Sequence, residues 1–134
     1  MRTHHLLVSA LGILLLCTGW LAADEKRAFQ ENLDTAIAEG IKMLESQEYS
    51  KFLKTFVDPE QFKKFSELGD IEEFAKKFGE KKGKQLLEVL KSIKGKTPKM
   101  EEDGKKATFD IKIEGVSKDS IIFAKVEKYW YIKN

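Results

Sequence analysis

Residues 106–113 read Lys-Ala-Thr-Phe-Asp-Ile-Lys-Ile, so that polar and apolar side chains alternate strictly along this stretch. A hydrophobic period of two is typical of a β-strand that buries one face and exposes the other. The preceding Asp103-Gly104 favours a two-residue hairpin turn. On the far side of that turn, residues 97–102 are charged and contain a proline, which fits an edge strand. The chain is therefore expected to change to β-structure after Gly95.

Two further strands are predicted after this one. Residues 120–126 form the most apolar stretch of the C-terminal part, which predicts a central strand that is dry on both faces. A tight turn at 127–128 leads to a last strand at 129–132, so that Tyr129 and Tyr131 share one face while Trp130 lies on the other. Either the two tyrosines or Trp130 must belong to the core. The other either packs under a loop or helix or forms an exposed interaction surface.

The sequence before Gly95 has the hydrophobic period of helices. Apolar residues recur every three or four positions over 29–44, which predicts one amphipathic helix, and the pattern resumes over 49–56 after a break near Ser46. Since helices come first and strands follow, the sequence predicts an α+β domain. In it, N-terminal helices pack against a C-terminal antiparallel meander of about four strands, with a cone-like shape.

Two helix starts can be placed more closely. Asp58-Pro59 combines an aspartate that caps free backbone N–H groups with a proline that fits the first helical turn. Asp70 is a second cap, with a glutamate three residues later as in a capping box. Gly79 and Gly83 are expected to weaken the helix that follows.

The first 23 residues have the order of a secretory signal peptide. A short basic start is followed by an apolar run and by small residues, ahead of an abrupt change to charged residues. We expect cleavage after Ala23, so that 1–23 is the signal peptide and 24–134 is a single domain, secreted or periplasmic. Contact with a membrane then occurs only during export or if the signal is retained. The alternatives are an uncleaved anchor, although the run falls short of about 20 apolar residues, and lipidation at Cys17, although Leu16 before it is not small.

The composition excludes several chemistries. The chain has one Cys and two His, and all three lie within the predicted signal peptide. Zinc, copper and iron–sulfur sites commonly use Cys and His as ligands, and Ser–His and Cys–His catalytic pairs require them. We therefore predict no metal and no cofactor. The 24 Lys and Arg residues nearly balance the 22 Asp and Glu residues, which argues against nucleic acid as a partner. Disulfides are excluded from residues 24–134 as well.

Carboxylates and aromatic residues remain as possible functional groups. Glu72-Glu73 and the acidic run 101–103 are expected to be solvated, because neighbouring acids rarely face each other across a cleft. Asp110 lies on the polar face of its strand, so it is a weak candidate for a general base, and no catalytic residue is predicted. A series of phenylalanines at helical spacing fits ordinary core better than a hydrophobic ligand box. Its members are Phe52, Phe56, Phe62, Phe65, Phe74 and Phe78.

The closing residues 107–111 and 121–134, which end in Trp130-Tyr131-Ile132, resemble the last strands of small exported proteins of the nuclear-transport-factor-like (cystatin-like) superfamily. The segment 56–60 is similar too, and the resemblance covers residues 29–134. It implies a curved sheet wrapped around a helix, with a cone for a small apolar ligand, but no particular activity. Two departures matter: no strands separate the second and third helices, and the cystatin signature Gln-x-Val-x-Gly is absent, so protease inhibition is not carried over.

These observations lead to one function and two alternatives. The first is an exported, non-enzymatic domain that binds a small apolar ligand or a partner protein. The first alternative is a small enzyme of the isomerase or cyclase type that uses carboxylate and Tyr, which requires a buried Asp or Glu facing a pocket. The second is a structural, envelope-associated interaction module that displays Tyr129 and Tyr131 on an open sheet face. The candidate contact residues are Phe109, Phe123, Tyr129, Trp130 and Tyr131.

Overall fold

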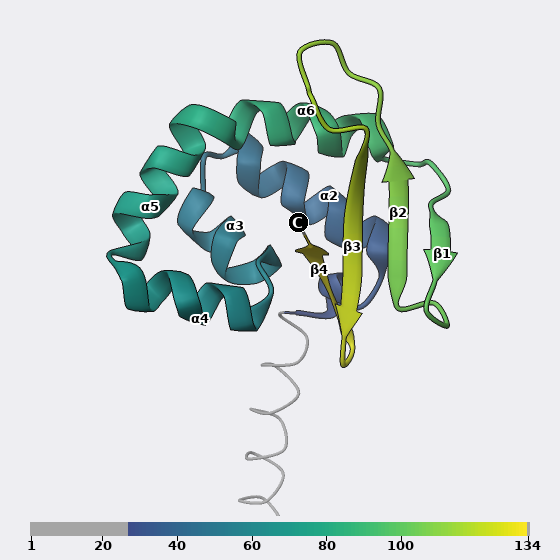
Figure 1. Ribbon diagram of the computed structural model, residues 1–134, viewed down its shortest axis with the longest axis horizontal. Coiled ribbons are helices and arrows are strands. Elements are labelled where there is room, and N and C mark those ends of the chain that lie inside the picture. The colour runs from purple at the N-terminus through teal and green to yellow at the C-terminus, as the bar shows by residue number, and fades with distance from the viewer. Residues whose placement is uncertain (1–26, 134) are drawn as a thin grey trace, which may run out of the picture.

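The computed structural model describes residues 27–133, and the predicted signal peptide with its cleavage site lies outside them. Helices come first and a four-stranded antiparallel sheet follows, which confirms the α+β prediction (Figure 1). The helical elements are η1 (Ala28–Gln30), α2 (Leu33–Glu45), α3 (Tyr49–Phe56), α4 (Pro59–Leu68), α5 (Ile71–Phe78), the π-helical turn η2 (Gly79–Gly83) and α6 (Lys84–Ile93). The strands are β1 (Lys99–Glu101), β2 (Lys106–Asp110), β3 (Ser120–Val126) and β4 (Tyr129–Lys133).

Capping side chains explain where the helices begin. Asp58 accepts the Glu60 backbone N–H at 2.8 Å, and Asp70 accepts that of Glu72 at 3.0 Å, so both predicted starts are confirmed. The prediction of one helix over 29–44 is wrong at its N-terminal end. Asn32 caps α2 by accepting the Asp34 N–H, and residues 28–30 form a separate 3-10 turn. The predicted break after α2 is confirmed, since Gln47 has a positive φ of 59°.

The sheet has the order β1-β2-β3-β4, which places β1 at an edge and β3 in the interior as predicted. The expectation that β3 is dry on both faces is wrong, because only Ile121 and Phe123 on one face are buried, while Ile122 on the other is half-buried. The strand predicted over 106–113 ends at Asp110, and the residues after it form a loop.

The two hairpin turns compare differently with the prediction. The turn at 127–128 is confirmed, because Val126 pairs with Tyr129. The two-residue turn expected at Asp103-Gly104 is wrong: Glu101 pairs with Lys106, so the loop has four residues. Its first three residues all take left-handed backbone angles, with φ of 53°, 55° and 80°. The last paired residues of β1 and β2 therefore each lie one position farther from the turn than a two-residue turn would place them.

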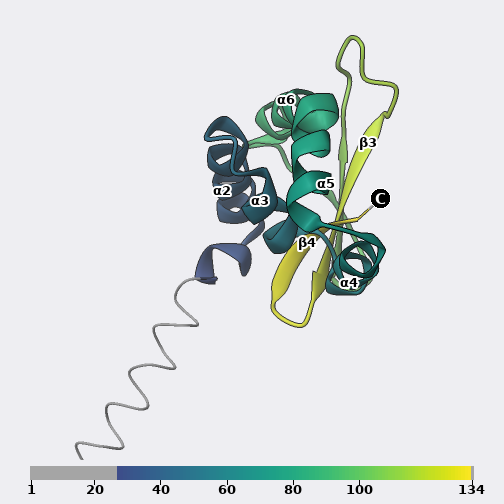
Figure 2. The ribbon, with the colours of Figure 1, turned by 90° about the vertical axis from the view of Figure 1, so that its left-hand side faces the viewer.

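One hydrophobic core lies between the helices and one face of the sheet, and Figure 2 shows α2, α3 and α6 together on one side of β3. Phe109 and Phe123 meet edge to face on the sheet, with ring centroids 5.8 Å apart. Gly40 allows α2 to lie close to α6, because a Cβ there would be 3.3 Å from Leu90 Cδ1. None of the helices within residues 27–133 is long and apolar enough to cross a membrane.

Gln30 ties the N-terminal turn to the helices and the sheet. Its side chain is fully buried, and its Nε2 donates to the Thr55 carbonyl at 2.7 Å and to the Trp130 carbonyl at 2.9 Å. Arg27 donates to its Oε1 at 3.1 Å. All the hydrogen-bonding groups of this buried amide thus face partners, as a polar side chain in a core requires.

Candidate ligand-binding groove

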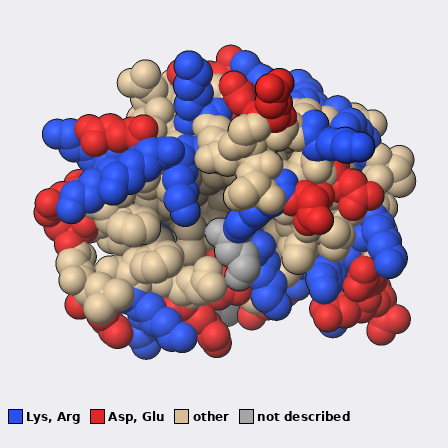
Figure 3. Space-filling model, turned by 45° about the horizontal axis from the view of Figure 1, so that its top comes forward, with Lys and Arg blue, Asp and Glu red and all other residues tan. Residues whose placement is uncertain are grey.

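Two adjoining cavities lie between the helices and the sheet. The first has a volume of about 420 Å³ and is lined by residues of α3, α4, α5, η2, α6 and β4. The second has a volume of about 250 Å³ and is lined by Phe78, by residues of η2, α6, β3 and β4, and by the loop after β2. Phe78, Lys82, Leu86 and Ile132 line both cavities, so the two lie side by side, and we call them together the apolar groove. Figure 3 shows a hollow in the middle of one face of the molecule, with Lys or Arg side chains along its border.

Phenylalanine rings form much of the groove. Phe78 stacks on Phe52 with ring centroids 6.2 Å apart and planes 13° from parallel. Phe65 of α4 stacks on Phe74 of α5 at 5.0 Å, and Phe74 remains 41% exposed. Helix α4 buries no residue fully, and the half-buried Phe65 lines the groove beside Phe74.

The interpretation of the phenylalanine series as ordinary core holds for part of it only. Phe52 and Phe56 are buried in the core, although both also border the groove. Phe65, Phe74 and Phe78 line the groove and are not fully buried, and Phe62 is half-buried on α4. Helical spacing predicts which side chains share a helix face, but not whether another element covers that face.

Four lysines stand among these apolar side chains. Lys77, Lys81 and Lys82 line the first cavity, and Lys82 and Lys118 line the second. No Asp or Glu of the described residues lines either cavity. Lysine stems are apolar while the ammonium groups reach water, so such residues border an apolar site without a large desolvation cost.

Lys81 and Lys82 are carried on a π-helical turn whose shape depends on two glycines. The ring of Tyr49 lies against Gly79 and Gly83: a Cβ at Gly79 would be 2.3 Å from Tyr49 Cδ2, and one at Gly83 would be 2.7 Å from Cε1. Only glycine permits this approach. Single π-helical turns within α-helices occur frequently at functional sites, and this one lies between α5 and α6 at the wall of the groove.

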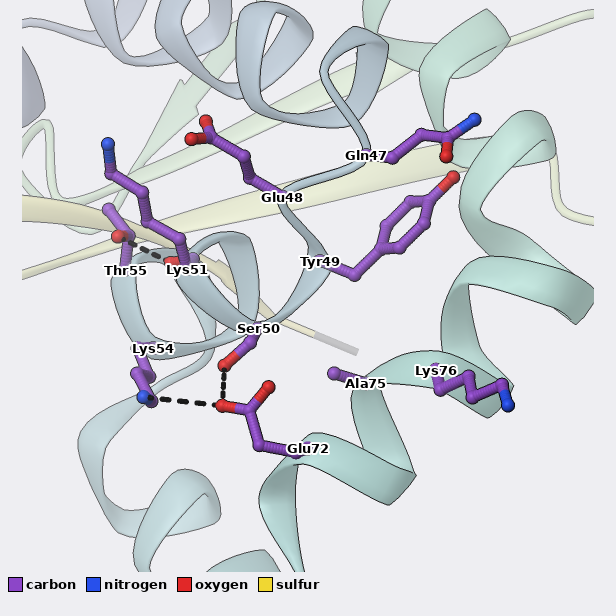
Figure 4. A pocket seen from close by; sticks show the side chains of 10 residues that line it. All are labelled: Gln47, Glu48, Tyr49, Ser50, Lys51, Lys54, Thr55, Glu72, Ala75 and Lys76. Atoms are coloured by element: carbon purple, nitrogen blue, oxygen red, sulfur yellow. Dashed lines mark hydrogen bonds and ion pairs between the residues drawn. The ribbon is translucent and has the colours of Figure 1, made fainter.

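A separate, polar depression lies between α3 and α5, with Tyr49 in its lining (Figure 4). Its volume is about 680 Å³, and in it Ser50 Oγ donates to Glu72 Oε1 at 2.7 Å while Lys54 Nζ lies 3.8 Å from the same oxygen. The Glu72 side chain is 70% exposed, which confirms that this carboxylate is solvated. Water around the group weakens any electrostatic activation of the serine, so the apolar groove is the better candidate site.

The enzyme alternative requires a buried acid that faces a pocket. Among residues 27–133, Gln30 is the buried polar residue, and no Asp or Glu is buried. Asp110 is exposed, on the face of β2 that its alternation predicts. The feature that would distinguish a carboxylate enzyme is therefore not found in the described part of the chain.

The five predicted contact residues lie elsewhere than the groove. Phe109, Phe123 and Trp130 are buried on the core side of the sheet, and Tyr131 is buried on the other side. Tyr129 is half-buried, with the Arg27 guanidinium 4.7 Å from its ring centroid. None of the five lines the two cavities that form the groove.

The residues that do line the groove were not singled out as a site by the sequence. The sequence pattern predicts Ile132 only as part of the last strand. One signal was available: residues 76–84 read Lys-Lys-Phe-Gly-Glu-Lys-Lys-Gly-Lys, a concentration of positive charge in a chain whose charges otherwise balance. Comparison of the chain with protein-family models, with curated proteins and with solved structures finds no match.

Proposed function

We propose that this protein binds a small, predominantly apolar molecule in the apolar groove, without catalysing a reaction on it. The observation that carries the proposal is the groove itself. Its two parts, about 420 and 250 Å³, together fall in the range of small-molecule sites, roughly 300–1,000 Å³, and they are lined mainly by apolar and aromatic side chains with a few polar ones.

Two expectations from the sequence support the proposal. The resemblance of residues 29–134 to the nuclear-transport-factor-like (cystatin-like) superfamily implies a cone between helix and sheet, which is where the groove lies. The predicted signal peptide would bring the protein to the periplasm or outside the cell, where a carrier with such a groove would keep an apolar molecule in solution.

The exposed aromatic rings give a physical reason for a ligand. The Phe65–Phe74 pair borders the first cavity and leaves apolar surface in contact with water. Covering such surface is favourable by about 25 cal/mol per Å². A ligand chain should therefore gain about 0.8 kcal/mol for each methylene that it buries, which is roughly a fourfold gain in affinity.

The proposal can be tested with a neutral fluorescent probe, N-phenyl-1-naphthylamine, and its displacement by straight-chain alcohols. We expect the probe to bind with increased fluorescence, and the affinity of the alcohols to rise about fourfold per methylene until the groove is filled. Absence of probe binding, or an affinity that does not depend on chain length, would contradict the proposal.

A pair of variants locates the binding. Leu86→Trp introduces a large ring at a residue that lines both cavities and should reduce probe binding at least tenfold. Leu87→Trp is the matched control, because Leu87 is half-buried in the same helix and does not line the groove. Equal loss in both variants would show that binding occurs elsewhere or depends only on stability, which thermal unfolding measures independently.

A further inference from the structure

We infer that the ligand of the apolar groove is a straight-chain carboxylate, whose tail lies in the groove and whose head group meets Lys81 and Lys82. This inference rests on the proposed function, and it adds the chemical class of the ligand. It depends on the charge at the groove, on the partners of the lysines, on the backbone that carries them and on the volume of the first cavity.

The charge around the groove is strongly one-sided. Residues 76–84 contain five Lys and one Glu, whereas the whole chain has 24 basic and 22 acidic residues. Of these five lysines, Lys77, Lys81 and Lys82 line the groove, and no Asp or Glu within 27–133 does so. Within the described residues, the charged side chains that border this apolar space are all positive, which is complementary to a molecule with an apolar body and a negative end.

Lys81 and Lys82 are the groups best placed to meet such a negative end. Lys77 already lies 3.7 Å from Glu73, in an ion pair whose side chains are 64% and 67% exposed. Lys81 and Lys82 are exposed on η2, and neither forms an ion pair with a carboxylate of the described residues. A ligand anion would therefore not have to displace an internal partner from them.

The backbone and the kinds of side chain favour a carboxylate over a phosphate. Phosphate sites commonly use free backbone N–H groups at a helix N-terminus, or arginine, which matches phosphate with two parallel hydrogen bonds. Here α5, η2 and α6 follow one another without a break from Ile71 to Ile93, so the lysines stand in the interior of a continuous helical segment. No Arg of the described residues lines the groove. Two lysine point charges at an open mouth suit a singly charged head group.

The volume of the first cavity sets the length of the chain. If a methylene occupies about as much space as a water molecule, roughly 30 Å³, a cavity of about 420 Å³ has room for about 14 methylenes at most, so a chain of 12 carbons fits. Dodecanoate is therefore the probe of choice. Dodecanol has the same tail without the charge, and dodecyl phosphate has the same tail with a different anion.

The experiment measures displacement of N-phenyl-1-naphthylamine by these three compounds at low salt, below the concentrations at which they aggregate. We expect dodecanoate to bind about tenfold more tightly than dodecanol, the effect that two exposed charge pairs supply. The advantage should shrink when salt screens the charges. In the double variant Lys81→Gln/Lys82→Gln, the tenfold ratio between the affinities for dodecanoate and dodecanol should fall to about one.

The matched control is Lys76→Gln/Lys84→Gln, which removes the same charge from the same segment at positions that do not line the groove. It should change dodecanoate binding less than twofold. An equal loss in both double variants would overturn the inference, because the lysines would then act only through general attraction. All four replaced lysines are exposed, so both double variants should fold, and thermal unfolding checks this. If a double variant unfolds, the single replacements Lys81→Gln and Lys82→Gln repeat the test.

The remaining outcomes separate this inference from the proposed function. Equal binding of dodecanoate and dodecanol would overturn the carboxylate inference and leave the apolar groove as a binding site. Tighter binding of dodecyl phosphate than of dodecanoate would overturn the choice of carboxylate. Failure of the probe and of all three compounds to bind would overturn the proposed function itself.

Discussion

Replacing Gly79 by alanine should destabilise the protein, although alanine normally stabilises a helix. The reason is the ring of Tyr49, since a Cβ on Gly79 would lie 2.3 Å from Cδ2 and Cε2 and 2.9 Å from Cγ. The whole edge of the ring is involved, so a small rotation does not relieve the clash. The ring also packs edge to face on Phe78, with centroids 6.2 Å apart, which restricts its movement away from the helix.

The size of the effect follows from two opposing contributions. Alanine in place of glycine inside a helix contributes about 1 kcal/mol of stability. Overpacking costs about 1–3 kcal/mol, and contacts as short as those of Tyr49 place this site at the upper end. The net loss should be about 2 kcal/mol, or roughly 8 °C in Tm. With Tyr49 replaced by alanine the clash disappears, so Gly79→Ala should then stabilise by about 1 kcal/mol.

The assay is urea unfolding followed by circular dichroism on the parent protein, Gly79→Ala, Tyr49→Ala and the double variant. The cycle should give a coupling of about 3 kcal/mol between the two sites. Gly69→Ala is a control, because nothing lies within 4 Å of a Cβ there and its backbone is extended. If Gly79→Ala were stabilising by the same amount with and without the Tyr49 ring, the explanation for the glycine would be wrong.

Three further predictions concern the stability of the fold. Gln30→Ala should lower the free energy of unfolding by about 2–4 kcal/mol, because the buried carbonyl of Trp130 and the part-buried carbonyl of Thr55 lose their donor; a loss below 1 kcal/mol in urea unfolding would contradict this. Asp58→Ala should cost about 1 kcal/mol by removing the cap of α4, whereas Asp58→Asn should be nearly neutral, and equal losses would exclude capping as the cause. Tyr131→Ser should cost about 3 kcal/mol of stability, as loss of a buried aromatic ring does. Tyr129→Ser should cost clearly less, because Tyr129 is only half-buried. If thermal unfolding showed the larger loss for Tyr129→Ser, the burial of the two residues would be misassigned.

The predictions were most accurate where the structure depends on residues that are close in sequence. The caps at Asp58 and Asp70 and the turn at 127–128 were predicted correctly, because each depends on residues that are close in sequence. The bounds of β3 were also predicted correctly from its apolar run. The Asp103-Gly104 turn was wrong although it is local, because Glu102 takes a left-handed backbone angle that its residue type does not favour.

The candidate site was beyond the reach of sequence patterns. The aromatic residues of the last strand were chosen because three in succession must occupy both faces, yet Trp130 and Tyr131 are buried and Tyr129 is half-buried beside Arg27. The groove instead forms where the rings of α4 and α5 meet Ile132, which pairs with Val57.

The sequence by itself determined the order of helices and strands, the helix starts at Asp58 and Asp70, and the face that β2 buries. It did so because hydrophobic period and capping act over a few neighbouring residues. Only the tertiary structure decided which phenylalanines are core and which border a cavity, and that Gly79 and Gly83 make room for the Tyr49 ring. Those properties depend on contacts between segments distant in the chain, and no local pattern specifies the space left between them.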